Sequence, residues 1–187
     1  MLDEWWRRTY VSGRRRAAMN PEFLSGEASA APAVADLLSL AHELAEVGVP
    51  GGALGARNGL RTTTHADLPW ARLGDQDFVE VADYDPNLGR LLCIGKRAPT
   101  PDAPLLALIL RAKKELAAVA VLQGQAARAP PGTPSAKRGS KPVEDALAAL
   151  EGLRSHDIVV LGDDLVVAAS RVAELRTACL SVLGAQG

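Results

Sequence analysis

The sequence contains few of the residues that bind transition metals. Only three of its 187 residues are histidine (His42, His65 and His156), and no two of them stand at a spacing typical of a metal site. A catalytic zinc ion needs about three protein ligands, most of them histidines. We therefore predict no metal site and no cofactor, and we expect three unrelated histidines at the surface or at the ends of secondary-structure elements.

Cysteine is equally scarce. Cys93 and Cys179 each lie within a short apolar run, where a free cysteine behaves as a small hydrophobic residue. No apolar run approaches the roughly 18 residues of a membrane span. The opening residues 3–8 do not resemble a secretion signal. We expect a cytoplasmic protein that is neither exported nor embedded in a membrane.

Several short catalytic motifs are absent as well. The sequence has no Gly-x-Gly-x-x-Gly, no phosphate-binding loop with a lysine, no Cys-x-x-Cys pair and no Gly-x-Ser-x-Gly elbow. Nucleotide binding, thiol redox chemistry and serine hydrolysis therefore lack support. The net charge of -1 provides no overall field that would attract nucleic acid or an anionic membrane.

The length and composition fit one domain that follows a basic arm. Hydrophobic residues make up 48% of the chain, which is enough to bury a core. Residues 1–32 carry arginine runs and then a Ser/Ala/Gly/Pro stretch, so we predict a disordered arm there and a domain over 33–187. The arm has two interpretations: a leader before a start at Met19, which we favour, or an Arg- and Trp-bearing tether for nucleic acid or acidic lipid. Within the domain, residues 128–141 are predicted to form a solvated, proline-rich loop.

The periodicity of the apolar residues predicts a mixed α/β fold. The strand at 117–122 is apolar throughout, as expected for a central strand that is covered on both faces. Turn chemistry at 85–89 and 162–164 predicts two hairpins. Helices are predicted for residues 34–47, 100–114, 142–152 and 171–183, and strands for 60–64, 78–81, 91–94, 117–122, 157–161 and 165–168.

Read in order, residues 34–183 resemble the class II aldolase/adducin family. Gly52-Ala53-Leu54-Gly55-Ala56-Arg57 is similar to the turn with which that family binds a substrate phosphate, and Pro99-Thr100-Pro101-Asp102 to its Pro-Ser-Ser-Glu motif. Val121-Leu122-Gln123 stands where the family has a metal-binding His-x-His, and Gly162-Asp163-Asp164 where it has a third metal histidine. The resemblance implies a three-layer α/β/α sandwich around a mostly antiparallel sheet, shortened in the middle after Gln123.

The resemblance also implies that the metal ligands of the family are lost. Val121 and Gln123 replace two histidines, and Asp102 replaces the general acid/base glutamate. We therefore predict a non-catalytic domain without metal. Such a domain would work as an oligomeric scaffold, as the head domain of adducin does, or bind a small anionic or phosphorylated ligand. We expect a homo-oligomer, and the candidate ligand-binding residues are Gly52, Thr63, Thr64, Thr100 and Asp102.

Two alternatives remain open at this point. The first is an active sugar-phosphate aldolase or epimerase in which Asp102, Asp163 and Asp164 supply oxygen ligands for Mg²⁺ or Ca²⁺. We favour a simpler interpretation of Gly162-Asp163-Asp164 as a tight hairpin turn. The second and weaker alternative makes the arginine-rich arm a tether for nucleic acid or a membrane.

Overall fold

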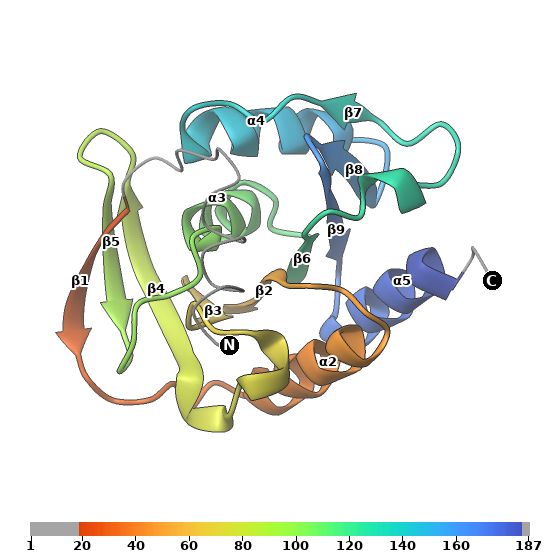
Figure 1. Cartoon of the computed structure of the whole chain (residues 1–187). Coiled ribbons are helices and arrows are strands. Elements are labelled where there is room, and N and C mark those ends of the chain that lie inside the picture. The colour runs from red at the N-terminus through yellow and green to blue at the C-terminus, as the bar shows by residue number, and fades with distance from the viewer. Residues whose placement is uncertain (1–18, 185–187) are drawn as a thin grey trace, which may run out of the picture.

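The computed structural model describes residues 19–184, in which one nine-stranded sheet lies between two helical layers (Figure 1). Neighbouring strands are antiparallel except at the two edges, where β1 pairs with β5 and β7 with β8 in parallel. The predicted mostly antiparallel sheet is therefore confirmed. In spatial order the strands are β1 (Asn20–Ser25), β5 (Arg90–Ile94), β4 (Phe78–Asp85), β3 (Arg61–His65), β2 (Gly52–Asn58), β6 (Ala118–Leu122), β9 (Asp164–Ala169), β8 (Ile158–Leu161) and β7 (Ser135–Ala136).

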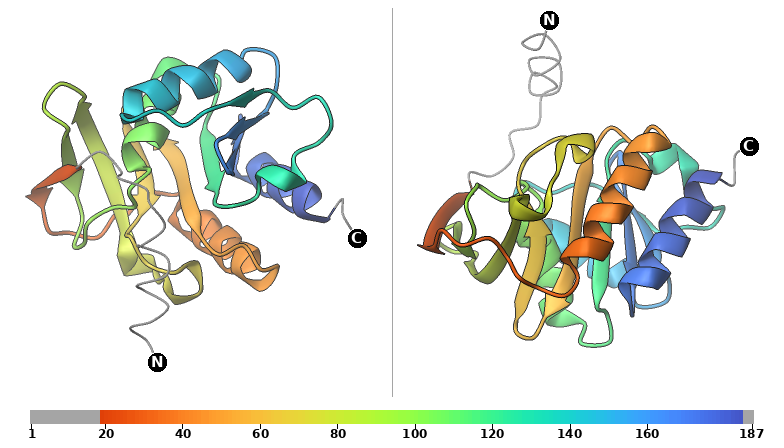
Figure 2. Two further views of the ribbon diagram at one scale, coloured as in Figure 1. Left: turned by 45° about the horizontal axis from the view of Figure 1, so that its top comes forward. Right: turned by 90° about the horizontal axis from the view of Figure 1, so that it is seen from below.

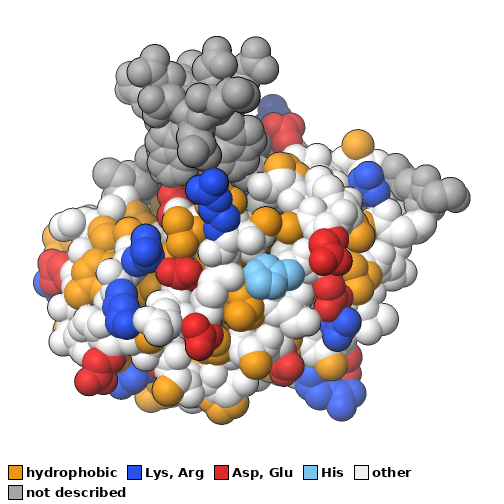
Figure 3. Space-filling view, turned by 60° about the horizontal axis from the view of Figure 1, so that its bottom comes forward, with side chains coloured by type: hydrophobic (Ala, Val, Ile, Leu, Met, Phe, Trp, Pro, Cys, Tyr) orange, Lys and Arg blue, Asp and Glu red, His pale blue; other side chains and the backbone are white. Residues whose placement is uncertain are grey.

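Two helices cover each face of the sheet (Figure 2). On one face α2 (Val34–Glu46) packs beside α5 (Val172–Gly184), and on the other α3 (Ala103–Ala112) packs against α4 (Pro142–Gly152). This arrangement confirms the predicted three-layer sandwich. Three single turns of 3-10 helix complete the described structure: η1 (Trp70–Arg72), η2 (Asp75–Asp77) and η3 (Ala126–Arg128). Acidic and basic side chains are interspersed over the face that carries α2 and α5 (Figure 3).

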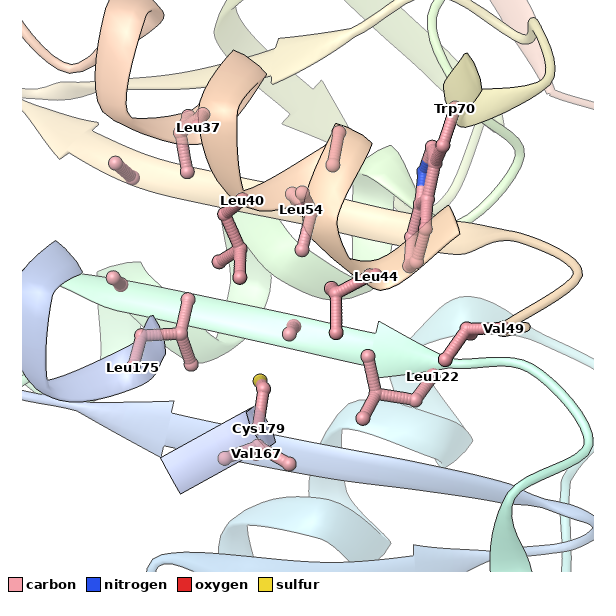
Figure 4. Close-up of a cluster of buried hydrophobic side chains, with 14 of the residues drawn as sticks. Leu37, Leu40, Leu44, Val49, Leu54, Trp70, Leu122, Val167, Leu175 and Cys179 are labelled. Atoms are coloured by element: carbon pink, nitrogen blue, oxygen red, sulfur yellow. The ribbon is translucent and has the colours of Figure 1, made fainter. Parts of the chain in front are cut away.

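The central strand β6 shows why helices must cover both faces of the sheet. Its five residues are buried, and successive side chains point to opposite faces of the sheet. Ala118, Ala120 and Leu122 join the core under α2 and α5, and Val119 and Val121 join the core under α3 and α4. Figure 4 shows the first of these cores, in which Leu44 of α2 lies close to Leu122 and Leu40 lies near Leu54.

Residues 20–25, which we expected in the disordered arm, form the edge strand β1. The Asn20 amide donates to the carbonyl of Gly89 at 3.1 Å, and the Gly95 amide donates to the carbonyl of Ser25 at 2.9 Å. Pro21 lacks an N–H group and is tolerated because β1 is an edge strand. The sheet therefore begins within the segment that composition alone assigned to the arm, and the arginines at 7–16 lie outside the described residues.

Residues 128–141, which we predicted as a solvated, proline-rich loop, also contribute a short strand to the sheet. The carbonyl of Pro134 accepts the Val160 amide at 2.8 Å, and the carbonyl of Ala136 accepts the Gly162 amide at 2.9 Å. These bonds add the two-residue strand β7 to the far edge of the sheet. The loop is thereby fastened beside the hairpin of β8 and β9. Within residues 19–184, no helix has both the length and the apolar character needed to cross a membrane.

Candidate functional site

The carboxylates of three aspartates converge on one arginine. Nη1 of Arg138 lies 3.0 Å from Oδ1 of Asp102 and 3.0 Å from Oδ2 of Asp145. Its Nη2 and Nε both donate to Oδ2 of Asp164, at 2.8 and 3.2 Å. One guanidinium therefore bridges three carboxylates, and we call these four residues the Arg138 cluster.

The cluster forms where two helices begin and a hairpin turns. Asp102 is the N-cap residue of α3, and Asp145 lies in the first turn of α4, where the helix dipole stabilises a negative charge. Asp164 is the first residue of β9. Gly162 adopts a φ of 64°, and a Cβ at this position would lie only 3.1 Å from Cγ of Arg138. A glycine here permits both the turn and the close approach of the arginine.

The cluster is largely shielded from solvent. Asp102 and Asp145 are each 6% exposed, and Asp164 is 1% exposed. Burial lowers the pKa of the Arg138 guanidinium, but the charges of Asp102 and Asp164 outweigh this effect and raise that pKa above its ordinary value. Arg138 is therefore a permanent cation among the three carboxylates.

Backbone amides complete the hydrogen bonding of two of these carboxylates. Oδ1 of Asp164 accepts the Gly124 amide at 2.9 Å, and Oδ1 of Asp145 accepts the Gly139 amide at 2.7 Å. Both bonds come from loop residues that have no regular partner in the sheet. The cluster thus also fixes the chain that leaves β6 and the chain that enters α4.

Sequence reasoning missed Arg138 because its partners are distant along the chain. Asp102 lies 36 positions away and Asp164 lies 26 positions away, so the only local signal is Asp145, seven positions later. The interpretation of Asp163 and Asp164 as simple turn residues needs a correction. Asp163 is exposed in the turn, whereas Asp164 belongs to strand β9 and directs its buried carboxylate to the arginine.

Three of the five predicted ligand-binding residues lie close together. The Thr100 hydroxyl donates to the carbonyl of Gly52 at 3.3 Å, and Asp102 follows two residues later. Gln123 lies at the same end of the sheet, because its amide donates to the carbonyl of Gly51 at 3.0 Å. Gly52 and Thr100 therefore lie at the same end of the central strands as Asp102 and the rest of the Arg138 cluster.

The other two, Thr63 and Thr64, lie inside the protein. Both are 0% exposed, and as neighbours in β3 they point to opposite faces of the sheet. The Thr64 hydroxyl donates to the carbonyl of Leu54 at 2.7 Å. Within residues 19–184 the Thr63 hydroxyl has no hydrogen-bond partner. These two residues do not join the other three, and ligand binding by any of the five stays a prediction.

The segment that resembles a phosphate-binding turn is a strand. Gly52 to Arg57 lie in β2, and the Arg57 guanidinium caps the C-terminal end of α3. It donates to the carbonyls of Lys113 and Leu116, each at 2.9 Å from Nη2, and also to that of Leu110. Since Asp102 begins α3, Arg57 and Asp102 stand at opposite ends of that helix. Arg57 thus supports the helix instead of facing the Arg138 cluster.

His65 is the last residue of β3, as expected of a boundary histidine, but its side chain lies in the core. It is 1% exposed, and Nε2 accepts hydrogen bonds from the Leu54 amide at 3.2 Å and from Nε1 of Trp70 at 3.1 Å. Nδ1 lies 2.8 Å from the carbonyl of Ala66 and therefore donates. Burial lowers the pKa of His65 to about 4, only partly opposed by the bond to Ala66. His65 is a neutral, structural histidine.

The donor set does not fit a transition metal at the position that the resemblance implies. Val121 has no donor atom, is 0% exposed and packs into the core under α3 and α4. Gln123 offers only an amide, and the hairpin turn contains no histidine. Within the described part of the chain, no three His, Cys, Asp or Glu side chains are grouped so that they could hold a metal ion. Asp102 and Asp164, which lie in segments that resemble the metal site of the family, bind the Arg138 guanidinium.

Solved structures that match this chain share one fold, whereas comparisons of the sequence find no match. No protein-family model matches the sequence, and no curated protein matches it. Among solved structures, an L-fuculose 1-phosphate aldolase matches with a TM-score of 0.64 and 14% identity, over 84% of this chain and 85% of that one. L-fuculose-1-phosphate aldolase from Thermus thermophilus matches with a TM-score of 0.65 and 15% identity, over 81% and 89%. A sugar-phosphate aldolase from Thermotoga maritima matches with a TM-score of 0.58 and 14% identity, over 80% of this chain and 93% of that one. The chain therefore has the class II aldolase fold, as the resemblance predicted.

Proposed function

We propose that this chain is a class II aldolase-like protein that acts by binding and assembly and not by metal-dependent aldol cleavage. The observation that carries the proposal is the donor set at the implied metal position. Val121 is a buried apolar residue there, Gln123 is a neutral amide, and the hairpin turn has no histidine. The fold is retained, but the side chains that would hold a zinc ion are missing.

Aldol cleavage makes demands that these residues do not meet. Cleavage next to a carbonyl generates an enediolate, and a bound metal ion stabilises that charge by several kcal/mol. Asp102, which stands at the place of the general acid/base, is engaged by Arg138 at 3.0 Å. While the Arg138 guanidinium occupies this carboxylate oxygen, a substrate cannot contact it. Neither the stabilisation of the enediolate by a metal ion nor the general acid/base step is therefore well provided for.

The charge of the Arg138 cluster favours the scaffold role over the binding of a phosphorylated ligand at this place. Three carboxylates surround one guanidinium, so an approaching phosphate would meet more negative than positive charge. Arg57, the residue that resembles a phosphate ligand, is committed to the end of α3. A homo-oligomeric scaffold is the function that remains best supported, with the resemblance to adducin as its precedent.

The alternative of an active lyase with carboxylate ligands requires a rearrangement. Asp102 and Asp164 would have to release Arg138 before they could bind a metal ion. Asp163, the third residue of that hypothesis, is exposed in the turn. The tether alternative depends on the arginines before residue 19, and salt-sensitive DNA binding that a chain beginning at Met19 loses would support it.

An assay on the purified protein tests the proposal. Full-length protein would be incubated with a panel of sugar phosphates and with Zn²⁺, Mn²⁺ or Mg²⁺ in turn, and aldehyde release would be coupled to NADH oxidation. We expect no release above the background of the metal alone, and light scattering that shows a homo-oligomer. Metal-dependent release of an aldehyde would overturn the non-catalytic assignment, and a monomer would overturn the scaffold.

A further inference from the structure

Glu80 is a buried carboxylate that the candidate functional site does not use. It lies in β4 and is 7% exposed. Oε1 accepts the Ser29 hydroxyl at 3.0 Å, and Oε2 accepts Nδ2 of Asn58 at 3.2 Å and Nη1 of Arg61 at 3.4 Å. A carboxylate offers about four lone-pair sites. The bonds from the described residues therefore leave about one acceptor site of Glu80 for a further donor.

Thr63 lies directly opposite Glu80 in the neighbouring strand. Opposite residues of an antiparallel pair point to the same face of the sheet, with their Cβ atoms about 4.5–5.5 Å apart. Because Glu80 in β4 reaches Asn58 in β2, its side chain extends across β3, the strand that carries Thr63. Thr63 is 0% exposed, and its hydroxyl has no hydrogen-bond partner among the residues that the structure describes. A buried hydroxyl and a buried carboxylate thus lie on one face without a direct bond between them.

We propose that one buried water molecule bridges the Thr63 hydroxyl and the carboxylate of Glu80. Buried polar groups are nearly always hydrogen-bonded, and internal water is the usual partner where the protein provides none. A water molecule can accept the proton of the Thr63 hydroxyl and donate one of its own to Glu80. The inference does not depend on the proposed function, because neither residue belongs to the Arg138 cluster.

The surroundings of Thr63 limit the ligand to a molecule of this size. On the side away from Glu80, Thr63 pairs with Ala56 of β2, whose side chain is a single methyl group. Ala56 is 1% exposed, so the two residues lie too deep for a larger molecule to reach them from solvent. An internal water molecule typically has two to four polar partners, and Thr63 and Glu80 supply two of them.

The proposed water would also support the connection between β1 and α2. Ser29 lies in this connection, and its hydroxyl donates to Glu80 and accepts the Ala31 amide at 3.2 Å. The Ser29 amide donates to the carbonyl of Phe78 in β4 at 3.3 Å. The carboxylate of Glu80 is thus one of the points at which the connection is fastened to the sheet. A water molecule that holds this carboxylate in place makes that attachment more rigid.

The first test compares the thermal unfolding of the full-length wild type with that of Thr63→Val, in which a methyl group of similar size replaces the hydroxyl. If the water is bound, valine removes one of its partners, and we expect Tm to fall by about 2–4 °C. If the hydroxyl has no partner at all, valine removes an unsatisfied polar group from a strand, and Tm should rise. The sign of the change therefore distinguishes the two cases.

Thr64→Val is the matched control. Thr64 is the next residue of β3 and is also 0% exposed, but its hydroxyl donates to the carbonyl of Leu54 at 2.7 Å. This substitution should lower Tm, which shows how much the loss of one satisfied hydroxyl costs in the same strand.

A crystal structure of the full-length wild type tests the water directly. We expect density for one water molecule within about 3.2 Å of Oγ1 of Thr63 and of a carboxylate oxygen of Glu80. An unchanged or raised Tm of Thr63→Val overturns the proposal, and so does wild-type density without a water molecule at this place. If Thr63→Val does not fold, the wild-type density decides alone. The proposed function fails on a different observation, metal-dependent aldehyde release by the wild type, so the two outcomes are distinguishable.

Discussion

Arg138 and Asp164 are joined by two hydrogen bonds to a single carboxylate oxygen, from Nη2 at 2.8 Å and from Nε at 3.2 Å. Asp164 is 1% exposed, so this ion pair lies in the interior of the cluster. The pair links the proline-rich loop to the central part of the sheet. Its removal should therefore affect the whole domain and not only the loop.

Replacing Asp164 with asparagine should lower the free energy of unfolding by about 1.5–3 kcal/mol, because Arg138 loses its closest charged partner while Asp102 and Asp145 remain. Urea denaturation of Asp164→Asn against wild type measures this cost. Asp157→Asn, at an exposed position before β8, is the matched control and should change stability by less than about 0.5 kcal/mol. Equal effects of the two substitutions would show that the ion pair contributes nothing.

Arg57 should be important for α3. It binds the carbonyls of Lys113 and Leu116 at the end of that helix, and Arg57→Ala should lower the free energy of unfolding by about 2–3 kcal/mol. Arg57→Lys should recover only part of the loss, because a lysine cannot bridge several carbonyls in the same way. Arg171→Ala, whose side chain is 76% exposed, should have little effect in the same chemical denaturation experiment. Full recovery by lysine would contradict the capping role.

Gly52 should tolerate no side chain. A Cβ there would lie 1.8 Å from the carbonyl oxygen of Val121, and its φ of 145° is unfavourable for other residues. Gly52→Ala should therefore cost at least about 3 kcal/mol or prevent folding. Gly26→Ala, with no atom within 4 Å of the new Cβ, should fold normally. Differential scanning fluorimetry of both variants would check this, and a normal Tm for Gly52→Ala would refute the close approach of β2 to β6.

His65 should make the protein less stable in mild acid. Its pKa is about 4 in the folded state and about 6.5 when unfolded, so between these values the unfolded chain binds more protons. The free energy of unfolding should consequently fall as the pH decreases from about 6.5 to about 4, by up to about 3 kcal/mol from this residue.

Urea denaturation between pH 7 and pH 4.5 measures this dependence. His65→Gln should be less stable at pH 7, because it loses the bonds to Leu54 and Trp70, but its stability should depend less on pH. His156→Gln removes an exposed histidine and should keep the wild-type slope. An unchanged slope in His65→Gln would mean that His65 is not the acid-sensitive group.

Most of the fold could be predicted because its elements have strong local patterns. The uniformly apolar β6 and the Gly162 hairpin both lie where their sequences placed them. Strand β2 was missed because its glycines are poor strand formers, although they are needed for close contact with Val121 and Leu106. Strand β1 was missed because its pairing with β5 is a long-range contact at an exposed edge.

The site was less predictable than the fold. Asp102 could be singled out because it stands in a segment that resembles a known motif. Arg138 could not, because its proline-rich surroundings indicate only a solvated loop and its partners Asp102 and Asp164 come from elsewhere in the chain. The burial of His65 could not be predicted for a similar reason: two of the partners that satisfy its ring, Leu54 and Trp70, lie in other elements. Buried polar networks depend on tertiary contacts that local patterns do not contain.

The zinc content of the purified full-length protein is the most direct test of the central claim. The protein would be dialysed against excess Zn²⁺, passed through a desalting column and analysed by inductively coupled plasma mass spectrometry. Because Val121 and Gln123 stand where histidine ligands would be needed, we expect far less than one zinc per chain. One zinc per chain that survives desalting would contradict the account.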